Sequence, residues 1–147
     1  WDQGQIFFTP DKCWGMPPYY SQKMASENHL PICISTEVNS NSKFVDVIST
    51  KSEDGKEIVV KIVNTDKSDH LARLSIPGFS PVKSAKIITL SGELTDKNTP
   101  NSPTKCAPKF NQIESIRDIF QLSLPPYSYT IVRIKHRIQS SLKGTKR

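Results

Sequence analysis

The feature that most constrains the fold is a change of pattern near residue 31. Before it, residues 5–8 (Gln-Ile-Phe-Phe) predict one short apolar strand and residues 11–18 a loop. Residues 19–27 predict a helix, with the Pro-Pro pair just before it or in its first turn. One strand with one helix is half of a βα repeat and cannot bury both faces of the strand. We therefore expect another part of the protein to cover this segment.

After residue 31 the chain is a series of short strands separated by turns. Asp54-Gly55 is a strong hairpin signal, and apolar and polar side chains alternate between residues 71 and 76. Strands at this spacing predict a β-sandwich, in which the Ile/Val-rich stretch 57–64 is expected to be a central strand. Residues 97–108, with three prolines, are expected to form an ordered loop. The expected strands are residues 44–49, 57–64, 71–76, 85–90, 119–124 and 127–135.

Length and charge narrow the possible functions. The 147 residues suffice for about one domain, and no apolar run approaches the roughly 18 residues of a membrane span. No basic-then-apolar leader follows Trp1, so no targeting signal is visible and the compartment stays open. The net charge is +6, but residues 135–147 hold five basic side chains and no acidic one, which leaves +1 for the rest. A short basic end without an aromatic platform is typical of a solvated tail and does not favour nucleic-acid binding.

The sequence does not support metal, cofactor or nucleophile chemistry. There is no Cys-x-x-Cys pair, and the histidines have no metal-ligand spacing to one another or to the cysteines. We expect free thiols, and one disulfide stays open for an oxidising compartment. No Gly-x-Ser-x-Gly elbow or phosphate-cradling glycine loop is present, and the spacing of the 14 acidic residues nominates no catalytic pair. The cysteines and histidines are Cys13, Cys33, Cys106, His29, His70 and His136.

Several motifs, in a fixed order, share a pattern with a known enzyme family. Residues 1–10 read Trp-Asp-Gln-Gly-Gln-Ile-Phe-Phe-Thr-Pro, and residues 17–24 read Pro-Pro-Tyr-Tyr-Ser-Gln-Lys-Met. Later motifs are Leu90-Ser91-Gly92-Glu93, Asn98-Thr99-Pro100 and Pro125-Pro126-Tyr127-Ser128. Together they resemble the end of the catalytic barrel and the C-terminal β-sandwich of α-L-arabinofuranosidases of glycoside hydrolase family 51. The resemblance covers residues 1 to about 135.

The resemblance implies a mainly β fold. We expect a jelly-roll-like C-terminal β-sandwich preceded by a strand–helix remnant of a (β/α)8 barrel. Residues 1–30 would be the last strand, loop and helix of that barrel, residues 31–135 the sandwich, and residues 136–147 a basic, flexible tail. The partner of the sandwich would be the upstream barrel domain, on which it packs.

The resemblance also implies an activity for the intact protein. Such enzymes are retaining exo-hydrolases that remove terminal α-L-arabinofuranosyl groups from arabinose-containing polysaccharides without a cofactor. They use two glutamates about 5–5.5 Å apart. In the family, both glutamates lie on barrel strands upstream of the position of Trp1. We therefore expect no catalytic residue in this chain, and no activity from the chain alone.

Two residues are candidates for the substrate pocket of the intact enzyme. Barrel active sites lie at the C-terminal ends of the strands, which here corresponds to residues 9–16. Trp14 would stack on a sugar ring or wall the pocket together with Thr9. The alternative for Trp14 is packing under its own loop or against the sandwich. Other conspicuous residues are expected to serve in packing or capping: Asp2, Gln3, Gln22, Met24, Tyr127 and Tyr129.

Two other functional classes stay open. A stand-alone carbohydrate-binding or interaction module would present a row of exposed aromatic side chains on one sheet face. A binder of anionic surfaces would act through the basic tail, with steep salt dependence. Without a barrel, we expect a folded sandwich and a loose, aggregation-prone segment 1–30, with the apolar faces of residues 5–8 and of the helix exposed.

Overall fold

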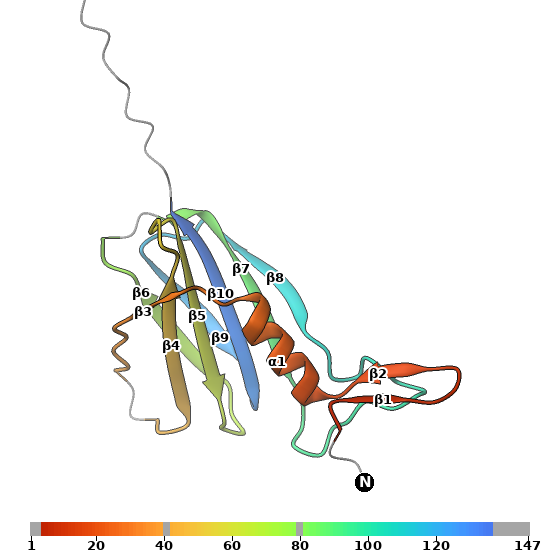
Figure 1. The fold of residues 1–147 in the computed structure, drawn as a ribbon. Coiled ribbons are helices and arrows are strands. Elements are labelled where there is room, and N and C mark those ends of the chain that lie inside the picture. The colour runs from red at the N-terminus through yellow and green to blue at the C-terminus, as the bar shows by residue number, and fades with distance from the viewer. Residues whose placement is uncertain (1–3, 40–41, 79–80, 137–147) are drawn as a thin grey trace, which may run out of the picture.

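A computed structural model describes residues 4–39, 42–78 and 81–136 (Figure 1). Trp1, Asp2, Gln3 and the tail from residue 137 onward, which the sequence analysis singled out, lie outside the described residues. The elements in chain order are β1 (Ile6–Phe8), β2 (Cys13–Gly15), α1 (Pro17–Glu27), β3 (Ile32–Ile34), β4 (Val45–Lys51), β5 (Glu57–Asn64), β6 (His70–Ser75), β7 (Pro81–Ser91), β8 (Lys109–Glu114), β9 (Ile119–Leu124) and β10 (Ser128–His136).

The main layer is an antiparallel sheet of six strands in the order β3-β4-β5-β10-β7-β8. Its central strand β10 is the last in sequence, and Val132 pairs with Val60 of β5 on one side and Ile87 of β7 on the other. Strand β5 lies in the interior of the sheet, as its Ile/Val-rich sequence predicts. Both strands are buried on their two faces, which explains their nearly continuous apolar sequences.

One face of this sheet is covered by the two-stranded antiparallel sheet β6-β9. Alternate side chains of β9 enter the core between the layers, where Phe120, Leu122 and Leu124 pack with residues of β5, β7 and β10. On β6, Ala72 and Leu74 point into the same core, as the alternation in the sequence predicts. The mainly β, sandwich-type fold expected from the sequence is confirmed.

The opposite face of the six-stranded sheet is covered by α1 (Figure 1). Met24, only 3% exposed, packs with Val59, Leu90 and Ile131 in a second core, which the following residue Leu30 completes. The expectation that the apolar face of this helix would be exposed is therefore wrong. The reason is that the outward side chains of β5 and β10 are themselves apolar and supply the cover that the helix needs.

Particular side chains determine where α1 begins and stabilise its C-terminal end. The Pro-Pro pair occupies its first turn, as expected from the sequence. At the other end, the Lys61 ammonium donates to the carbonyl of Ala25 at 3.0 Å, and Arg133 donates to the carbonyl of Glu27 at 3.4 Å. Cations at the C-terminus of a helix stabilise it through the helix dipole. Arg133 is held by two 2.7 Å hydrogen bonds to the carboxylate of Glu57, so the sheet fixes the helix end.

Three strands differ from the sequence prediction. Strand β2 forms inside the segment expected to be a loop, because it pairs with β1 in a hairpin. Strand β3 is only three residues long, too short for a periodic pattern. Strand β8 is an edge strand with mostly exposed, polar side chains, so the sequence lacks the apolar alternation of a half-buried strand. Within the described residues, no helix is long and apolar enough to cross a membrane.

Candidate functional site

The candidate site lies where the β1–β2 hairpin, the start of α1 and the loop 92–106 meet. The hairpin projects from the sandwich beside the N-terminal end of α1 (Figure 1). Its register pairs Ile6 with Gly15, Phe7 with Trp14 and Phe8 with Cys13. Ile6 and Phe8 therefore share one face of the hairpin, and Phe7 and Trp14 share the other.

The two predicted pocket residues, Trp14 and Thr9, both belong to this hairpin. Trp14 is half-buried and stacks on Phe7, with ring centroids 6.1 Å apart and an interplanar angle of 23°. The Thr9 hydroxyl donates to the Asp11 carboxylate at 2.9 Å, within the turn that joins the strands. The structure thus brings the two residues into one hairpin, and their role toward a sugar stays a prediction.

A close contact joins the hairpin to the helix. The amide of Met16 donates to the carbonyl of Gln5 at 2.8 Å, which closes the base of the hairpin. Next to it, the ring of Tyr19 packs so tightly on Gly15 that a Cβ atom at Gly15 would clash with the ring. Only glycine leaves room for this approach, so the residue pair sets how the hairpin meets α1.

The loop 92–106 is braced by polar side chains. Asp96 accepts a 2.7 Å hydrogen bond from the Lys105 ammonium and a 3.1 Å bond from the amide of Glu93. These bonds hold the pKa of Asp96 below its ordinary range. Asn98 is buried and bonds to both Cys106 and Gly15, so the loop reaches the hairpin. These hydrogen bonds agree with the expected ordered loop at residues 97–108.

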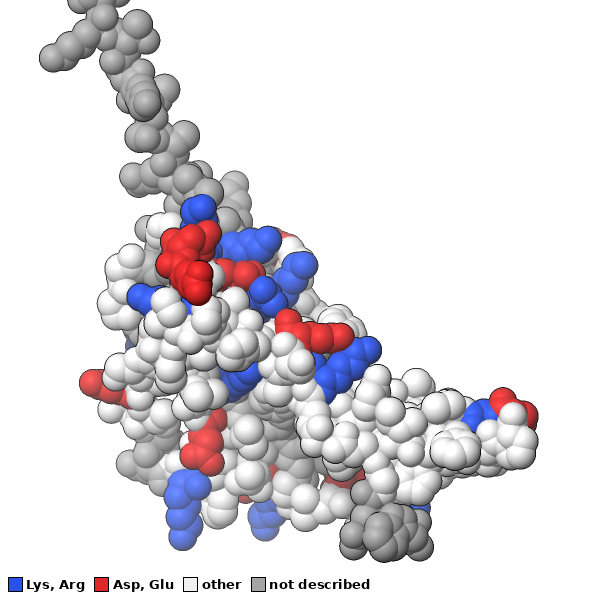
Figure 2. Space-filling model, in the orientation of Figure 1, with Lys and Arg blue, Asp and Glu red and all other residues white. Residues whose placement is uncertain are grey.

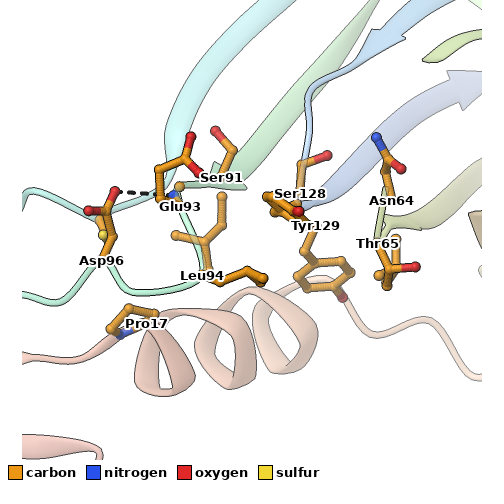
Figure 3. Close-up of a pocket in the computed structure, with 14 residues that line it drawn as sticks. Pro17, Asn64, Thr65, Ser91, Glu93, Leu94, Asp96, Ser128 and Tyr129 are labelled. Carbon is orange, nitrogen blue, oxygen red and sulfur yellow. Dashed lines mark hydrogen bonds between the residues drawn. The ribbon is translucent and has the colours of Figure 1, made fainter. Parts of the chain in front are cut away.

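A hollow of about 370 Å³ opens between the start of α1 and the ends of β5, β7 and β10 (Figure 3). Its apolar lining includes Pro17, Val63, Leu90, Leu94 and Tyr129. Leu94 is 78% exposed at this place. Polar side chains also line it, among them Asn64, Glu93 and Asp96, so the hollow joins an apolar floor to polar groups at its edge.

Of the residues expected to pack, Met24 is buried in the helix-side core. Gln22 is exposed on α1, so the expectation that it packs is wrong. Tyr129 packs against the helix-side core, where burial raises the pKa of its phenol. Tyr127 has φ +45° at the corner before β10, and its amide donates to the carbonyl of Asp66 at 3.0 Å.

Hydrogen bonds lower the pKa of several described acidic residues. Four of their carboxyl groups have a clearly shifted pKa, and each shift is downward: Asp54, Glu57, Asp66 and Asp96. The causes are hydrogen bonds from Ser52, Arg133, His70 and Lys105, respectively, and the Asp54 pKa falls to about 2. A general acid needs the opposite shift, because it must hold its proton near neutral pH.

Metal binding and thiol reactions each require a particular arrangement of side chains. Among the described residues, no group of three His, Cys, Asp or Glu side chains is placed to hold a metal ion. The three cysteines are free: Cys13 and Cys33 are exposed, and Cys106 is buried. Burial raises the pKa of the Cys106 thiol, which keeps it protonated and unreactive.

The charges on the surface are mixed. Figure 2 shows basic and acidic side chains side by side on the upper body, and a largely uncharged surface over the hairpin except at its tip. At that tip lie Asp11 and Lys12. On this face, the described residues form no extended basic stripe of the kind that tracks a nucleic-acid backbone.

Sequence reasoning missed Asn98 as a key residue of this site. The residue stands in a polar, proline-rich stretch, where asparagine ordinarily indicates a turn. Its importance arises from a hydrogen bond to Gly15, 83 positions away in the chain, which the local sequence pattern does not reveal. The one available signal is that Asn98 belongs to a motif of the family resemblance.

Comparison with known proteins places this fold in a family. A model of the alpha-L-arabinofuranosidase C-terminal domain matches residues 3–128. The chain is 24% identical over 137 residues to Alpha-L-arabinofuranosidase 1 of Arabidopsis thaliana; the match covers 88% of this chain and 20% of that protein.

Solved structures share the fold. The arabinose-bound MgGH51 α-L-arabinofuranosidase superposes with a TM-score of 0.85 at 18% identity, over 93% of this chain and 22% of that one. The α-L-arabinofuranosidase of Thermotoga maritima, in an arabinose complex, gives 0.82 at 21% identity, over 90% and 31%. This chain thus spans between 20% and 31% of the length of these relatives. Because the family model matches most of its residues, the chain belongs to the α-L-arabinofuranosidase C-terminal domain family.

Proposed function

We propose that this chain is the C-terminal region of a retaining α-L-arabinofuranosidase that releases terminal α-L-arabinofuranosyl groups from arabinose-containing polysaccharides. The observation that carries the proposal is the family match over residues 3–128. The catalytic glutamates lie in an upstream barrel, and this chain contributes support to that barrel. The downward pKa shifts of Asp54, Glu57, Asp66 and Asp96 support this division of labour, since none of these groups suits a general acid.

The domain braces the barrel through the end of the molecule that carries the hairpin. Three apolar side chains are strongly exposed on the hairpin and beside the hollow: Ile6, Phe8 and Leu94. β1 is the first of the described elements and belongs to this hairpin, so a domain that precedes it in sequence would join the protein at this same end. The outer face of α1 carries polar side chains such as Gln22 and Ser26 and is less suited to an apolar contact.

In the intact enzyme, Trp14 and Thr9 contribute to the wall of the substrate pocket. Both residues follow β1, at the end of a strand where barrel enzymes carry their active-site loops. The stack of Trp14 on Phe7 leaves the indole half-exposed, so it can offer part of its surface to a sugar ring.

The test combines a size measurement with an activity assay. The intact mass of the native gene product should be several times that of this chain, with two glutamates on upstream barrel strands. The purified chain alone should release no arabinose from a chromogenic α-L-arabinofuranoside. A native product that begins at Trp1, or activity of the purified chain that persists in the Trp14→Ala variant, would overturn the proposal.

The competing idea of a stand-alone carbohydrate-binding module makes a different prediction. Such a module needs aromatic side chains in a row, but the exposed Phe44 and Phe110 lie beside β4 and on β8. Three strands of the sheet separate β4 from β8, a distance of about 19 Å at the usual strand spacing. Retention of this chain on arabinoxylan or arabinan beads, abolished by Phe110→Ala, would favour the module and count against the bracing role.

A further inference from the structure

The side chain of Asn98 lies at the junction between loop and hairpin, and it is only 2% exposed. Its amide nitrogen donates to the carbonyl of Gly15 in β2 at 2.7 Å and to the carbonyl of Cys106 at 3.0 Å. Its amide oxygen accepts a 2.7 Å hydrogen bond from the backbone amide of Cys106. Both N–H groups of the side chain and its oxygen therefore have partners.

This pattern of bonds fixes the orientation of the Asn98 amide group. If the group were turned over, its nitrogen would face the N–H of Cys106, and its oxygen would face the carbonyl of Gly15. Two donors or two acceptors would then oppose each other in a buried place, which is costly. No other natural side chain of this length offers two N–H donors and one acceptor.

A second contact joins the loop and the hairpin farther out. The Lys12 ammonium, near the hairpin tip, donates to the carbonyl of Pro100 at 3.4 Å. The loop itself is closed by the Asp96–Lys105 ion pair and by a turn in which Thr99 and Ser102 exchange backbone hydrogen bonds. The loop is thus a braced element, and the hairpin is attached to it at its base by Asn98 and near its tip by Lys12.

We propose that Asn98 is a positioning residue that locks the β1–β2 hairpin to the sandwich and so holds Trp14 in one orientation. The argument starts at Gly15, the neighbour of Trp14 in β2, whose carbonyl accepts the Asn98 hydrogen bond. Fixing this carbonyl fixes the plane of β2 and with it the direction of the indole. The role of that orientation in sugar binding rests on the proposed function; the lock itself does not.

The test uses the whole chain with Trp1→Phe, so that Trp14 is the one remaining tryptophan. Asn98→Ala should raise the acrylamide quenching of Trp14 and shift its emission to the red. Amide hydrogen exchange in β1 and β2 should accelerate by about tenfold or more, because two or three hydrogen bonds are lost. Exchange in β5 and β10 should stay within about twofold of the parent, which a general loss of stability would not permit.

Two matched variants separate the lock from other effects. Asn98→Asp retains an acceptor for the Cys106 amide but loses both donors, so it should free the hairpin as Asn98→Ala does. Asn101→Ala removes an exposed asparagine side chain from the same loop and should change neither quenching nor exchange. Unchanged hairpin exchange in both Asn98 variants would overturn the proposal, and so would an equal acceleration in Asn101→Ala.

A measurement on the parent chain keeps the proposal testable if the Asn98 variants fail to fold. In NMR spectra, the two side-chain amide protons of Asn98 should exchange with solvent far more slowly than those of Asn101. Equal exchange rates for the two side chains would overturn the lock. None of these measurements involves sugar or a barrel, so failure of the proposed function would leave this result untouched, and the reverse also holds.

Discussion

The sandwich and the β1–β2 hairpin are stabilised by different kinds of interaction. In the sandwich, large apolar side chains such as Leu124, Ile131 and Ile134 are fully buried between layers. In the hairpin, each strand has three residues, and Phe8 is 80% exposed. A two-stranded hairpin alone is at best marginally stable in water. Its place is instead set by hydrogen bonds from the loop 92–106 and by one tight ring contact.

Because the two regions are stabilised differently, they tolerate different substitutions. Burial is spread over many side chains, so the sandwich loses stability in proportion to the volume removed. The hairpin depends on a few directional contacts, so a single change can free it while the sandwich stays folded. Substitutions that act on one region alone are therefore the sharpest tests of this contrast.

The largest effect is expected from Leu124→Ala in the core beneath β6-β9. The side chain is fully buried, and its loss leaves a cavity, so the free energy of unfolding should fall by about 3–5 kcal/mol. Urea denaturation followed by circular dichroism measures this change. Leu71→Ala, at a 69% exposed position on the neighbouring strand, should change stability by less than about 0.5 kcal/mol. Equal losses for the two variants would contradict the assigned core.

The next effect concerns the helix-side core. Met24→Ala should cost about 2–3 kcal/mol, because it removes the helix side chain that packs on Val59 and Ile131. Exchange of the α1 amides should accelerate more than that of β9. Gln22→Ala, on the exposed side of α1, provides the matched control. If α1 exchange were unchanged in Met24→Ala, the helix would not depend on this core.

The Glu57–Arg133 pair should make stability depend on pH. The hydrogen bonds from Arg133 lower the Glu57 pKa below its ordinary value of 4.5. The stabilising contribution is therefore complete above about pH 4.5 and is lost as the pH falls through the lower, folded-state pKa. Glu57→Gln should cost about 1–2 kcal/mol at pH 7 and flatten this acid limb in thermal melts. If the variant lost the same stability at low pH as the parent, other carboxylates would be the cause of that loss.

The smallest effect on global stability, but a large local one, is expected from Gly15→Ala. The new methyl group would clash with the Tyr19 ring, so hairpin exchange should accelerate by about tenfold, while global unfolding changes by less than about 0.5 kcal/mol. In a Tyr19→Ala background the clash disappears, so Gly15→Ala should add little there. A full additive effect in the double variant would show that the ring is not the cause.

The sequence reveals the sandwich better than the hairpin. The expected strands 57–64 and 119–124 correspond to β5 and β9 residue for residue, because buried strands carry apolar side chains that the sequence shows directly. The helix at residues 19–27 was predicted within two residues of its observed start. Strands without a buried face, such as β8, leave no such mark and were missed.

The candidate site is visible in the sequence only in part. Trp14 and Thr9 stand out by residue type and position, and the structure places both on the hairpin. Asn98 does not stand out, because its contacts span 83 residues and depend on the folded loop. The sequence also does not show that α1 packs on the sheet. That packing arises because β5 and β10 are neighbours and turn apolar side chains toward the helix.

The position of β10 in the sheet has a consequence for synthesis of the protein on the ribosome. β5 and β7 are joined in the sheet only through β10, which is the last of the described strands in chain order. Until Ser128–His136 has emerged, the nascent chain holds two half-sheets with open edges, which expose it to aggregation. The six-stranded sheet can therefore close only after β10 has emerged, and a premature stop before residue 128 would leave β5 and β7 without the strand that joins them.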